Sequence, residues 1–302
     1  MRAKIIGYRG LANSQQVIIS GHVFEKHKVW ETHPKHSRIR NFRQALKRYR
    51  VRTMDLATVE VTVNGKKKKV TTDEKGFFTC VFEHKNTKPG WYSYQLHWPR
   101  TGCHCEEAYF VANESVSGVI SDIDDTLLIS HSTKWMKKMA LILFRNAYSR
   151  KPIPMVKHWN ERLKLLNGEF HPDGFFYVSN SEWNLYDFLV DFFEINGLPR
   201  GVFLLQNLKE GLRDLVSRGR VNSNHKIETI RELLSFYPKK TFILVGDNGQ
   251  KDMEIYAEVC RDFPGRINSV MIRKLPYITN EKRFNRYRDI ISGLGVPFEH
   301  YH

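Results

Sequence analysis

The stretch GVISDIDDTLLIS, residues 118–130, places three carboxylates directly after an apolar run. They belong to Asp122, Asp124 and Asp125. Like charges held a few ångströms apart repel one another, and the cost grows as water is excluded. A folded protein normally keeps such a cluster where a cation or a reaction needs it. We therefore take this stretch as the first candidate for a functional site.

The chain around and after this stretch alternates apolar runs with helical patterns. The runs are GVISD (118–122), GFFYVS (174–179), GVFLL (201–205), KTFILVGD (240–247) and INSVMIRK (267–274), and the helical patterns lie around 183–195, 224–236 and 251–261. Continuous apolar strands separated by helices are typical of a parallel sheet that is covered on both faces. The pattern predicts an α/β domain over residues 116–302.

The chain before it reads as rich in β-strands. VEVTV (59–63) alternates apolar and polar residues, Asn64-Gly65 supplies a hairpin turn, and Gly76 marks a second turn before FFTCVFE. Strands with turns at this spacing predict a small β-sandwich over residues 1–115. Residues 33–52 insert a basic amphipathic helix, which either packs on its own domain or lies on an anionic membrane.

The charge of the chain is strongly positive and uneven. The formal net charge is +16, and residues 1–112 hold 21 Lys and Arg against 9 Asp and Glu. Such a field attracts nucleic acid, an anionic lipid surface or a phosphorylated substrate, or it serves solubility alone. Four cysteines, an N-terminus without an apolar signal region and the lack of an 18-residue apolar run favour the cytoplasm, with peripheral membrane contact as an extension.

Polar side chains follow the ends of the predicted parallel strands, where the ligand crevice of such sheets lies. These residues are Asp122, Asp124, Thr126, Ser179, Asn180, Asp247 and Asn248, with Gly246 directly before Asp247 and with Lys226 and Asp252 on adjoining helices. The four carboxylates of Asp122, Asp124, Asp247 and Asp252 are hard oxygen ligands that suit Mg²⁺. Ser179, Asn180 and Lys226 are suitable donors to a phosphoryl group, with Thr126, Gly246 and Asn248 in supporting places.

Those groups suit phosphoryl transfer. A carboxylate such as Asp122 can attack a phosphoryl group to give an aspartyl-phosphate, and Asp124 can act as acid and then as base. Each residue alone has a plainer reading. The first aspartates could cap a helix or hold a structural metal, Ser179 could satisfy backbone groups, and Lys226 could be a surface lysine. The joint order of the residues at strand ends is the specific signal.

Four segments in this order resemble the motifs of the haloacid dehalogenase superfamily: DIDDT, YVSNS, HKIETI and GDNGQKD. The resemblance implies a Rossmann-like parallel sheet, a small cap insertion around 130–172 and Mg²⁺. It also implies that Asp122 is the nucleophile and Asp124 the acid/base. Ser179 and Lys226 match the second and third motifs, and Asp247 and Asp252 match the acidic pair of the fourth.

A narrower resemblance is to the phosphatidate phosphatase family linked to cortical actin patches. FFYVSNSEWNLYDFL, LPRGVFLL and TFILVGDNGQKDMEIYAEV carry it, over roughly residues 113–275. The sequence departs at Glu182, where that family commonly has Pro. The resemblance implies Mg²⁺-dependent removal of phosphate from phosphatidate or a related lipid phosphomonoester.

Three functions remain open at this point. The first is that lipid phosphatase, with a basic apolar segment from Trp135 that either dips into a bilayer or closes the cap. The second is a phosphatase for nucleic-acid ends or another phosphomonoester, although the basic region lacks a recognisable nucleic-acid motif. The third is a non-catalytic scaffold that binds lipid or membrane. The sequence does not indicate an oligomeric state.

Overall fold

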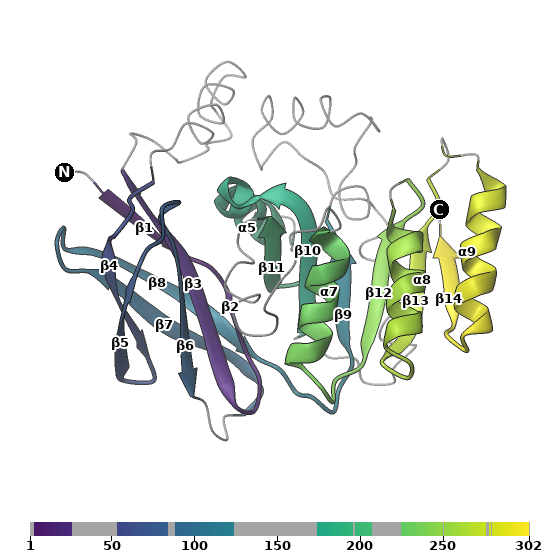
Figure 1. Ribbon diagram of the computed structural model, residues 1–302, viewed down its shortest axis with the longest axis horizontal. Coiled ribbons are helices and arrows are strands. Elements are labelled where there is room, and N and C mark those ends of the chain that lie inside the picture. Colours follow the sequence, from purple (N-terminus) through teal and green to yellow (C-terminus); the bar gives the residue numbers. More distant parts are fainter. Residues whose placement is uncertain are drawn as a thin grey trace, which may run out of the picture.

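The computed structural model describes residues 3–25, 53–83, 88–123, 174–195, 197–206, 225–249, 251–275, 278 and 280–301. Two sheets lie side by side in this structure (Figure 1). One is built from residues 3–111, which we call the N-terminal region, and the other from residues 118–301, which we call the C-terminal region. The predicted basic helix at 33–52 and the predicted cap at 130–172 lie outside the described residues.

The C-terminal region contains a six-stranded sheet in the order β11-β10-β9-β12-β13-β14, and every neighbouring pair is parallel. The strands are β9 (Gly118–Asp122), β10 (Phe175–Glu182), β11 (Gly201–Gln206), β12 (Phe242–Asp247), β13 (Ile267–Arg273) and β14 (Phe298–Tyr301). The chain builds outward from β9 in one direction and then returns to start β12 on its other side. The strand order therefore reverses between β9 and β12, where open α/β sheets form their ligand crevice.

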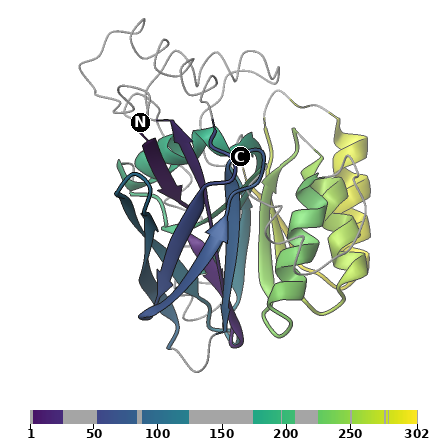
Figure 2. The same ribbon diagram turned by 60° about the vertical axis from the view of Figure 1, so that its left-hand side comes forward.

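Helices cover both faces of this sheet. They are α5 (Tyr186–Ile195) after the short helix η3 (Trp183–Leu185), α7 (His225–Phe236), α8 (Asp252–Asp262) and α9 (Glu281–Gly293). Helices α7, α8 and α9 lie together on one face (Figure 2). Helix α5 packs on the other, because Leu189 and Phe193 join the apolar cluster of Val119, whereas the α7–α9 side chains join that of the next residue, Ile120. The predicted parallel sheet and its three helices are confirmed.

The N-terminal region forms one eight-stranded sheet. Its strands are β1 (Ala3–Gly7), β2 (Gly10–Ala12), β3 (Gln16–Glu25), β4 (Thr58–Val63), β5 (Lys66–Thr71), β6 (Phe77–Glu83), β7 (Gly90–Trp98) and β8 (Cys103–Val111). The order is β1-β3-β2-β8-β7-β4-β5. Strands β1 and β2 pair with successive parts of one edge of β3, and β6 pairs with its opposite edge. The predicted hairpin turn is confirmed, since Asn64 and Gly65 have φ of 48° and 75°.

The predicted two-sheet sandwich differs from this arrangement in one respect. Strand β2 pairs with β3 on one side and with β8 on the other, so both halves join into one continuous sheet. Inward side chains from both halves, such as Ile19 in β3 and Leu96 in β7, still meet in one core. The first strands are short and interrupted at Tyr8–Arg9, and this break lets the chain change partners.

The two regions share apolar cores. Ile6, Tyr8, Phe24 and Phe77 of the N-terminal region belong to the cluster beneath α5. Leu11, Ile18 and Phe110 of the same region belong to the cluster beneath α7, α8 and α9. Among the described residues, none of the helices is both long enough and apolar enough to cross a membrane. The predicted boundary at residues 115 and 116 thus separates two sheets that bury side chains against each other.

Candidate active site

Asp122 ends the central strand β9. All five residues of this strand are buried, and Asp122 is only 1 % exposed. On one side, Asp122 pairs with Val178 of β10, so Ser179 lies one residue beyond it on the neighbouring strand. On the other side β9 pairs with β12, which ends at Asp247. The predicted nucleophile therefore lies at the point where the strand order reverses.

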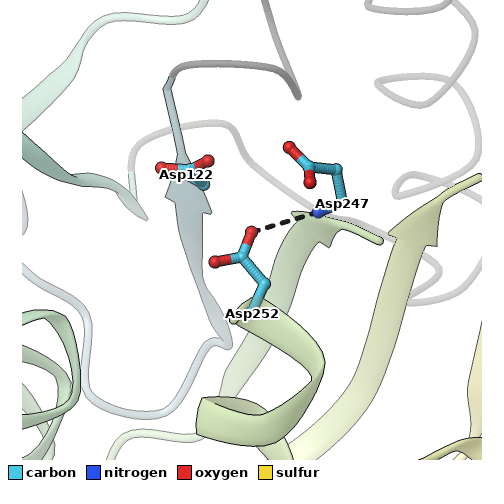
Figure 3. Close-up of side chains that lie close together, drawn as sticks. All are labelled: Asp122, Asp247 and Asp252. Carbon is cyan, nitrogen blue, oxygen red and sulfur yellow. Dashed lines mark hydrogen bonds between the residues drawn. The ribbon is translucent and has the colours of Figure 1, made fainter. Parts of the chain in front are cut away.

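Asp247 and Asp252 flank the tight connection from β12 to α8. The backbone N–H of Asp247 donates to Asp252 Oδ2 at 3.1 Å (Figure 3). The backbone N–H of Gly249 donates to Asp247 Oδ1 at 2.7 Å. A carboxylate that accepts hydrogen bonds from its own loop is held in one orientation. Both side chains are buried, and Figure 3 shows them beside Asp122.

The three carboxylates form a cluster that could hold a divalent cation. Ligand oxygens of Asp122, Asp247 and Asp252 all lie within 4.8 Å of one another. Asp122 Oδ2 is buried and has no hydrogen-bond partner among the described residues. Buried negative charges at this separation need a positive partner. Oxygen donors in this number fit Mg²⁺, which usually keeps several water ligands, better than they fit softer metals.

Lys226 brings a cationic side chain into this cluster. It lies in the first turn of α7, is 4 % exposed, and its Nζ lies 3.1 Å from Asp122 Oδ1. It also donates to Asp252 Oδ1. Burial alone would lower the pKa of Lys226, but Asp122 and Asp252 outweigh burial and raise it well above its ordinary value. Lys226 is therefore charged and offsets part of the negative charge of the cluster.

Burial acts on the Asp252 carboxylate in the opposite direction. It raises the pKa of Asp252, while Lys226 opposes that rise. Lys226 pairs with two of the three carboxylates, Asp122 and Asp252, so the cluster has an excess of carboxylate charge over the charge of Lys226 when all three are ionised. A bound divalent cation would remove this excess. The donor set thus fits the ion that the sequence predicted.

Two supporting residues have clear structural roles. A Cβ placed on Gly246 would lie 2.6 Å from Asp252 Oδ2 and 2.8 Å from a ring carbon of Tyr256, so only glycine admits this close approach. Asn248 is buried, and its Oδ1 accepts a hydrogen bond from the backbone N–H of Leu275 at 2.8 Å. Asn248 therefore ties the loop after β12 to the segment after β13.

Other predicted residues are only partly placed. Ser179 is fully buried at the end of the paired part of β10. The backbone of Asn180 lies in β10, but its side chain is not among those described. Asp124, Asp125 and Thr126 lie outside the described residues. The structure thus brings Asp122, Asp247, Asp252 and Lys226 together, and the predicted role of Asp124 stays a prediction.

Sequence reasoning missed Tyr256. Its buried hydroxyl donates to the backbone carbonyl of Val245 at 2.8 Å, and its ring lies against Gly246. Tyr256 stands four residues after Asp252, on the same face of α8. That spacing was the available signal, because a buried aromatic residue one turn after a ligand can fix the start of the helix.

Comparisons with known proteins show the family of this chain. The family model described as "Phosphatidate phosphatase APP1, catalytic domain" matches residues 117–274, more than half of the chain. The chain belongs to the APP1 catalytic-domain family. The matched range begins just before β9 and ends just after β13, so it includes all four clustered side chains of the site.

Two relatives of this APP1 family member come from yeasts. Phosphatidate phosphatase APP1 of Saccharomyces cerevisiae is 34 % identical over 156 residues, which is 52 % of this chain and 25 % of that protein. An uncharacterized protein of Schizosaccharomyces pombe is 28 % identical over 156 residues, covering 51 % of this chain and 24 % of that protein. The chain thus spans about a quarter of the length of each relative.

Among solved structures, a carbohydrate acetylesterase from Xanthomonas citri matches 96 % of this chain and 65 % of its own. The TM-score is 0.35 and the sequence identity 12 %, which is too low to establish a common fold.

Proposed function

We propose that this chain is a Mg²⁺-dependent phosphatase that removes phosphate from phosphatidate or a related lipid phosphomonoester. The observation that carries the proposal is the buried cluster of three carboxylates and Lys226 where the strand order reverses. Membership of a family named for phosphatidate phosphatase supports the reaction class and the substrate. Naming phosphatidate as the substrate goes beyond the reaction class, because the chain spans only a quarter of the length of its named yeast relative.

The first chemical step would use Asp122 as the nucleophile. An Asp122 oxygen attacks the phosphorus atom, the bond from phosphorus to the ester oxygen breaks, and diacylglycerol leaves with a proton from a general acid. The predicted acid is Asp124. Lys226, already within 3.1 Å of Asp122, would stabilise negative charge on the phosphoryl oxygens.

The second step would regenerate the enzyme. Water attacks the phosphorus atom of the aspartyl-phosphate, the bond from phosphorus to Asp122 breaks, and inorganic phosphate leaves. The same general acid, now ionised, would accept the proton of the water. Asp122, Asp247 and Asp252, with the predicted ligand Asp124, would hold the Mg²⁺ ion. When bound, that ion would lessen the repulsion between the incoming phosphate and the carboxylates.

The test is an Asp122→Asn variant assayed for phosphate release with and without Mg²⁺. Asparagine keeps the shape but cannot form the acyl phosphate, so turnover should fall by several orders of magnitude. Asp289→Asn is the matched control, since Asp289 lies on α9 with its side chain 66 % exposed. Near-full turnover by Asp122→Asn would rule out the proposed nucleophile.

The substrate is tested by a panel assayed with the wild-type chain. It contains phosphatidate in vesicles, lysophosphatidate, an aryl phosphate, sugar phosphates and oligonucleotides with a 3′ or 5′ phosphate. A lipid enzyme should prefer phosphatidate, and the preference should weaken at high salt if the net charge of +16 draws the chain to an anionic surface. Preference for an oligonucleotide would favour the nucleic-acid alternative. No turnover of any substrate would favour a scaffold.

A further inference from the structure

We propose that the N-terminal region positions the phosphate-binding segment Ser179–Glu182, acting through His22, Lys4 and Arg9. The inference rests on the proposed function for its effect on turnover. In this proposal the N-terminal region supports the active site by holding that segment in place, and His22 is the principal positioning residue.

The segment leaves the regular sheet before it ends. Val178 of β10 pairs with Leu204 of β11, and the next pair joins Glu182 to Gln206. From one pair to the next, β10 moves on by four residues and β11 by only two. The extra residues of β10 form a bulge at Ser179–Ser181. Pairing with β9 also stops at Val178. The ladders of the sheet thus hold both ends of the bulge and leave its middle to be fixed by other contacts.

The residue directly after the segment rests on the N-terminal region. The Trp183 ring stacks on the His22 ring of β3, with centroids 4.0 Å apart and planes at 10°. His22 is 1 % exposed, and its Nδ1 lies 2.8 Å from the Tyr8 hydroxyl. Burial lowers the pKa of His22 to about 3, so the ring is neutral at ordinary pH and packs as an aromatic surface. The stack fixes where the segment must end.

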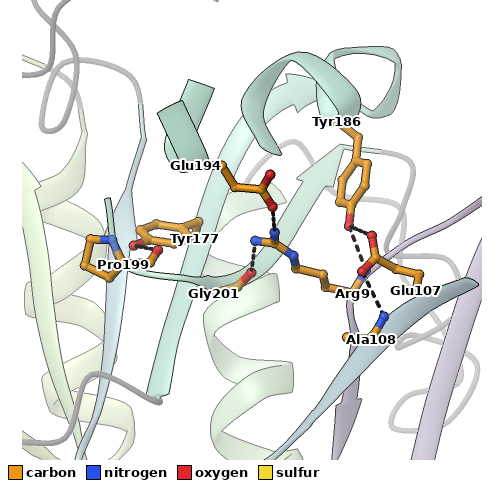
Figure 4. A network of polar contacts seen from close by, with 8 residues as sticks. All are labelled: Arg9, Glu107, Ala108, Tyr177, Tyr186, Glu194, Pro199 and Gly201. Atoms are coloured by element: carbon orange, nitrogen blue, oxygen red, sulfur yellow. Dashed lines mark hydrogen bonds and ion pairs between the residues drawn. The ribbon is translucent and has the colours of Figure 1, made fainter. Parts of the chain in front are cut away.

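The next helix along the chain, α5, is held by the same region at three places. Arg9 donates its backbone N–H to the Tyr186 hydroxyl at 2.9 Å, and its guanidinium donates to Glu194 at 2.9 Å and to the Gly201 carbonyl at 3.2 Å (Figure 4). Lys4 pairs with Asp187 at 3.3 Å.

The Tyr186 hydroxyl in turn donates to Glu107 of β8 at 3.3 Å. The first and last turns of α5 are therefore both anchored to the N-terminal region. Arg9 is 5 % exposed, so these partners compensate for the loss of water around its guanidinium.

These contacts place the segment between two fixed points. Val178 is fixed by the sheet, and Trp183 with α5 is fixed by the N-terminal region. Groups that stabilise a transition state must be held to within a fraction of an ångström, and a displacement of about 1 Å can cost on the order of 100-fold in rate. Loss of the His22 contact should therefore loosen the donors that flank Asp122.

The experiment compares His22→Ala with His22→Phe by hydrogen exchange and kinetics. Phenylalanine keeps an aromatic ring under Trp183, whereas alanine removes it. Val61→Ala is the matched control, because Val61 is fully buried in the N-terminal core and belongs to neither shared cluster. Lys4→Met, at a side chain only 34 % exposed, gives a milder second probe at the start of α5.

We expect at least about 10-fold faster amide exchange over residues 175–195 in His22→Ala, with α7 unchanged, and a smaller rise confined to α5 in Lys4→Met. His22→Phe and Val61→Ala should leave residues 175–195 as in the wild type. The kcat of His22→Ala should fall by about 10-fold to 100-fold with a smaller change in KM, and His22→Phe should restore most of it.

The two proposals fail in distinguishable ways. Unchanged exchange over residues 175–195 in both His22→Ala and Lys4→Met would overturn the positioning role, whatever the chain hydrolyses. Local exchange that rises with no loss of kcat would also overturn it. If the wild type hydrolyses no phosphomonoester, the proposed function fails, and the exchange results alone then decide whether the N-terminal region holds the segment.

Discussion

Gly246 illustrates how one missing side chain sets the geometry of the carboxylate cluster. The Asp252 carboxylate occupies the space that a Cβ on residue 246 would need, and Tyr256 closes the other side. The carboxylate can therefore approach the backbone N–H of Asp247. This dependence leads to a prediction about a single methyl group.

Gly246→Ala should lower the free energy of unfolding by about 1–3 kcal/mol, as expected for overpacking a buried site. If the chain is the Mg²⁺-dependent phosphatase proposed above, the variant should also lose turnover, because Asp252 must move. Urea denaturation and phosphate release measure the two effects. Gly293→Ala is the control, since a Cβ there meets nothing within 4 Å. An unchanged denaturation midpoint for Gly246→Ala would contradict the close approach seen here.

His22 makes the stability of the chain depend on pH in a defined direction. Its folded pKa is about 3, against an ordinary value of 6.5. Between these values the unfolded chain binds a proton that the folded chain does not, so the free energy of unfolding falls as pH falls from about 6.5 towards 3. Above about pH 6.5 the ring is neutral in both states, and its contribution is constant.

The measurement compares the wild type with His22→Phe. As the pH falls from 6 to 4, the wild type should lose free energy of unfolding relative to His22→Phe, by up to about 1.4 kcal/mol per pH unit. Other titrating groups are common to both chains and cancel. Parallel stability curves over this range would show that the ring is not buried in its neutral form.

At the scale of elements, the pattern of apolar residues predicted most of the strands and helices of the C-terminal region. Its first five strands and three of its helices follow runs that are continuously apolar or periodic at helical spacing. Strands β1, β2 and β14 were missed. Each has five residues or fewer, and each is defined by its partner, so its own sequence carries too few residues to show a period.

The candidate site was predictable for a related reason. Parallel strands bring their carboxyl ends to one edge, so Asp122, Asp247 and Lys226 could be grouped from the sequence alone. The role of His22 was not predictable in that way. Its contact with Trp183 joins strand β3 of one sheet to the short helix η3 that follows a strand of the other sheet. No periodicity within either segment indicates which sheet will pack against the other.

Strand β5 ends the described sheet path and carries four exposed lysines, Lys66 to Lys69. Charged side chains on an edge strand discourage pairing with another chain. We predict that the double variant Lys67→Val and Lys69→Val aggregates faster than the wild type, as followed by light scattering. Lys239→Val with Lys282→Val removes the same charge from exposed positions outside the strands and should not. Equal scattering by both would assign the lysines another role.

At the scale of the whole molecule, the two sheets pack against each other through shared apolar clusters. Both clusters that support the parallel sheet contain side chains of the N-terminal region. The family match begins at residue 117, yet the chain before it completes the packing around α5 and β11.

A fragment of residues 117–302 should therefore not fold cooperatively, because it exposes apolar surface that the N-terminal region covers. The full chain should unfold in one transition, with circular dichroism and tryptophan fluorescence coinciding. Thermal and urea melts of both proteins give the test. A fragment that melts sharply, with native-like ellipticity, would show that the C-terminal region stands alone.

The position of β12 beside β9 also sets when the site can exist during synthesis. Asp122 leaves the ribosome before its neighbours Asp247 and Asp252, which follow only after β10 and β11 have been made. Contacts so distant along the chain form slowly. A nascent chain that ends before residue 252 therefore contains Asp122 without the partners that complete the cluster. The cluster forms only after the N-terminal region has already emerged as a surface for the later strands.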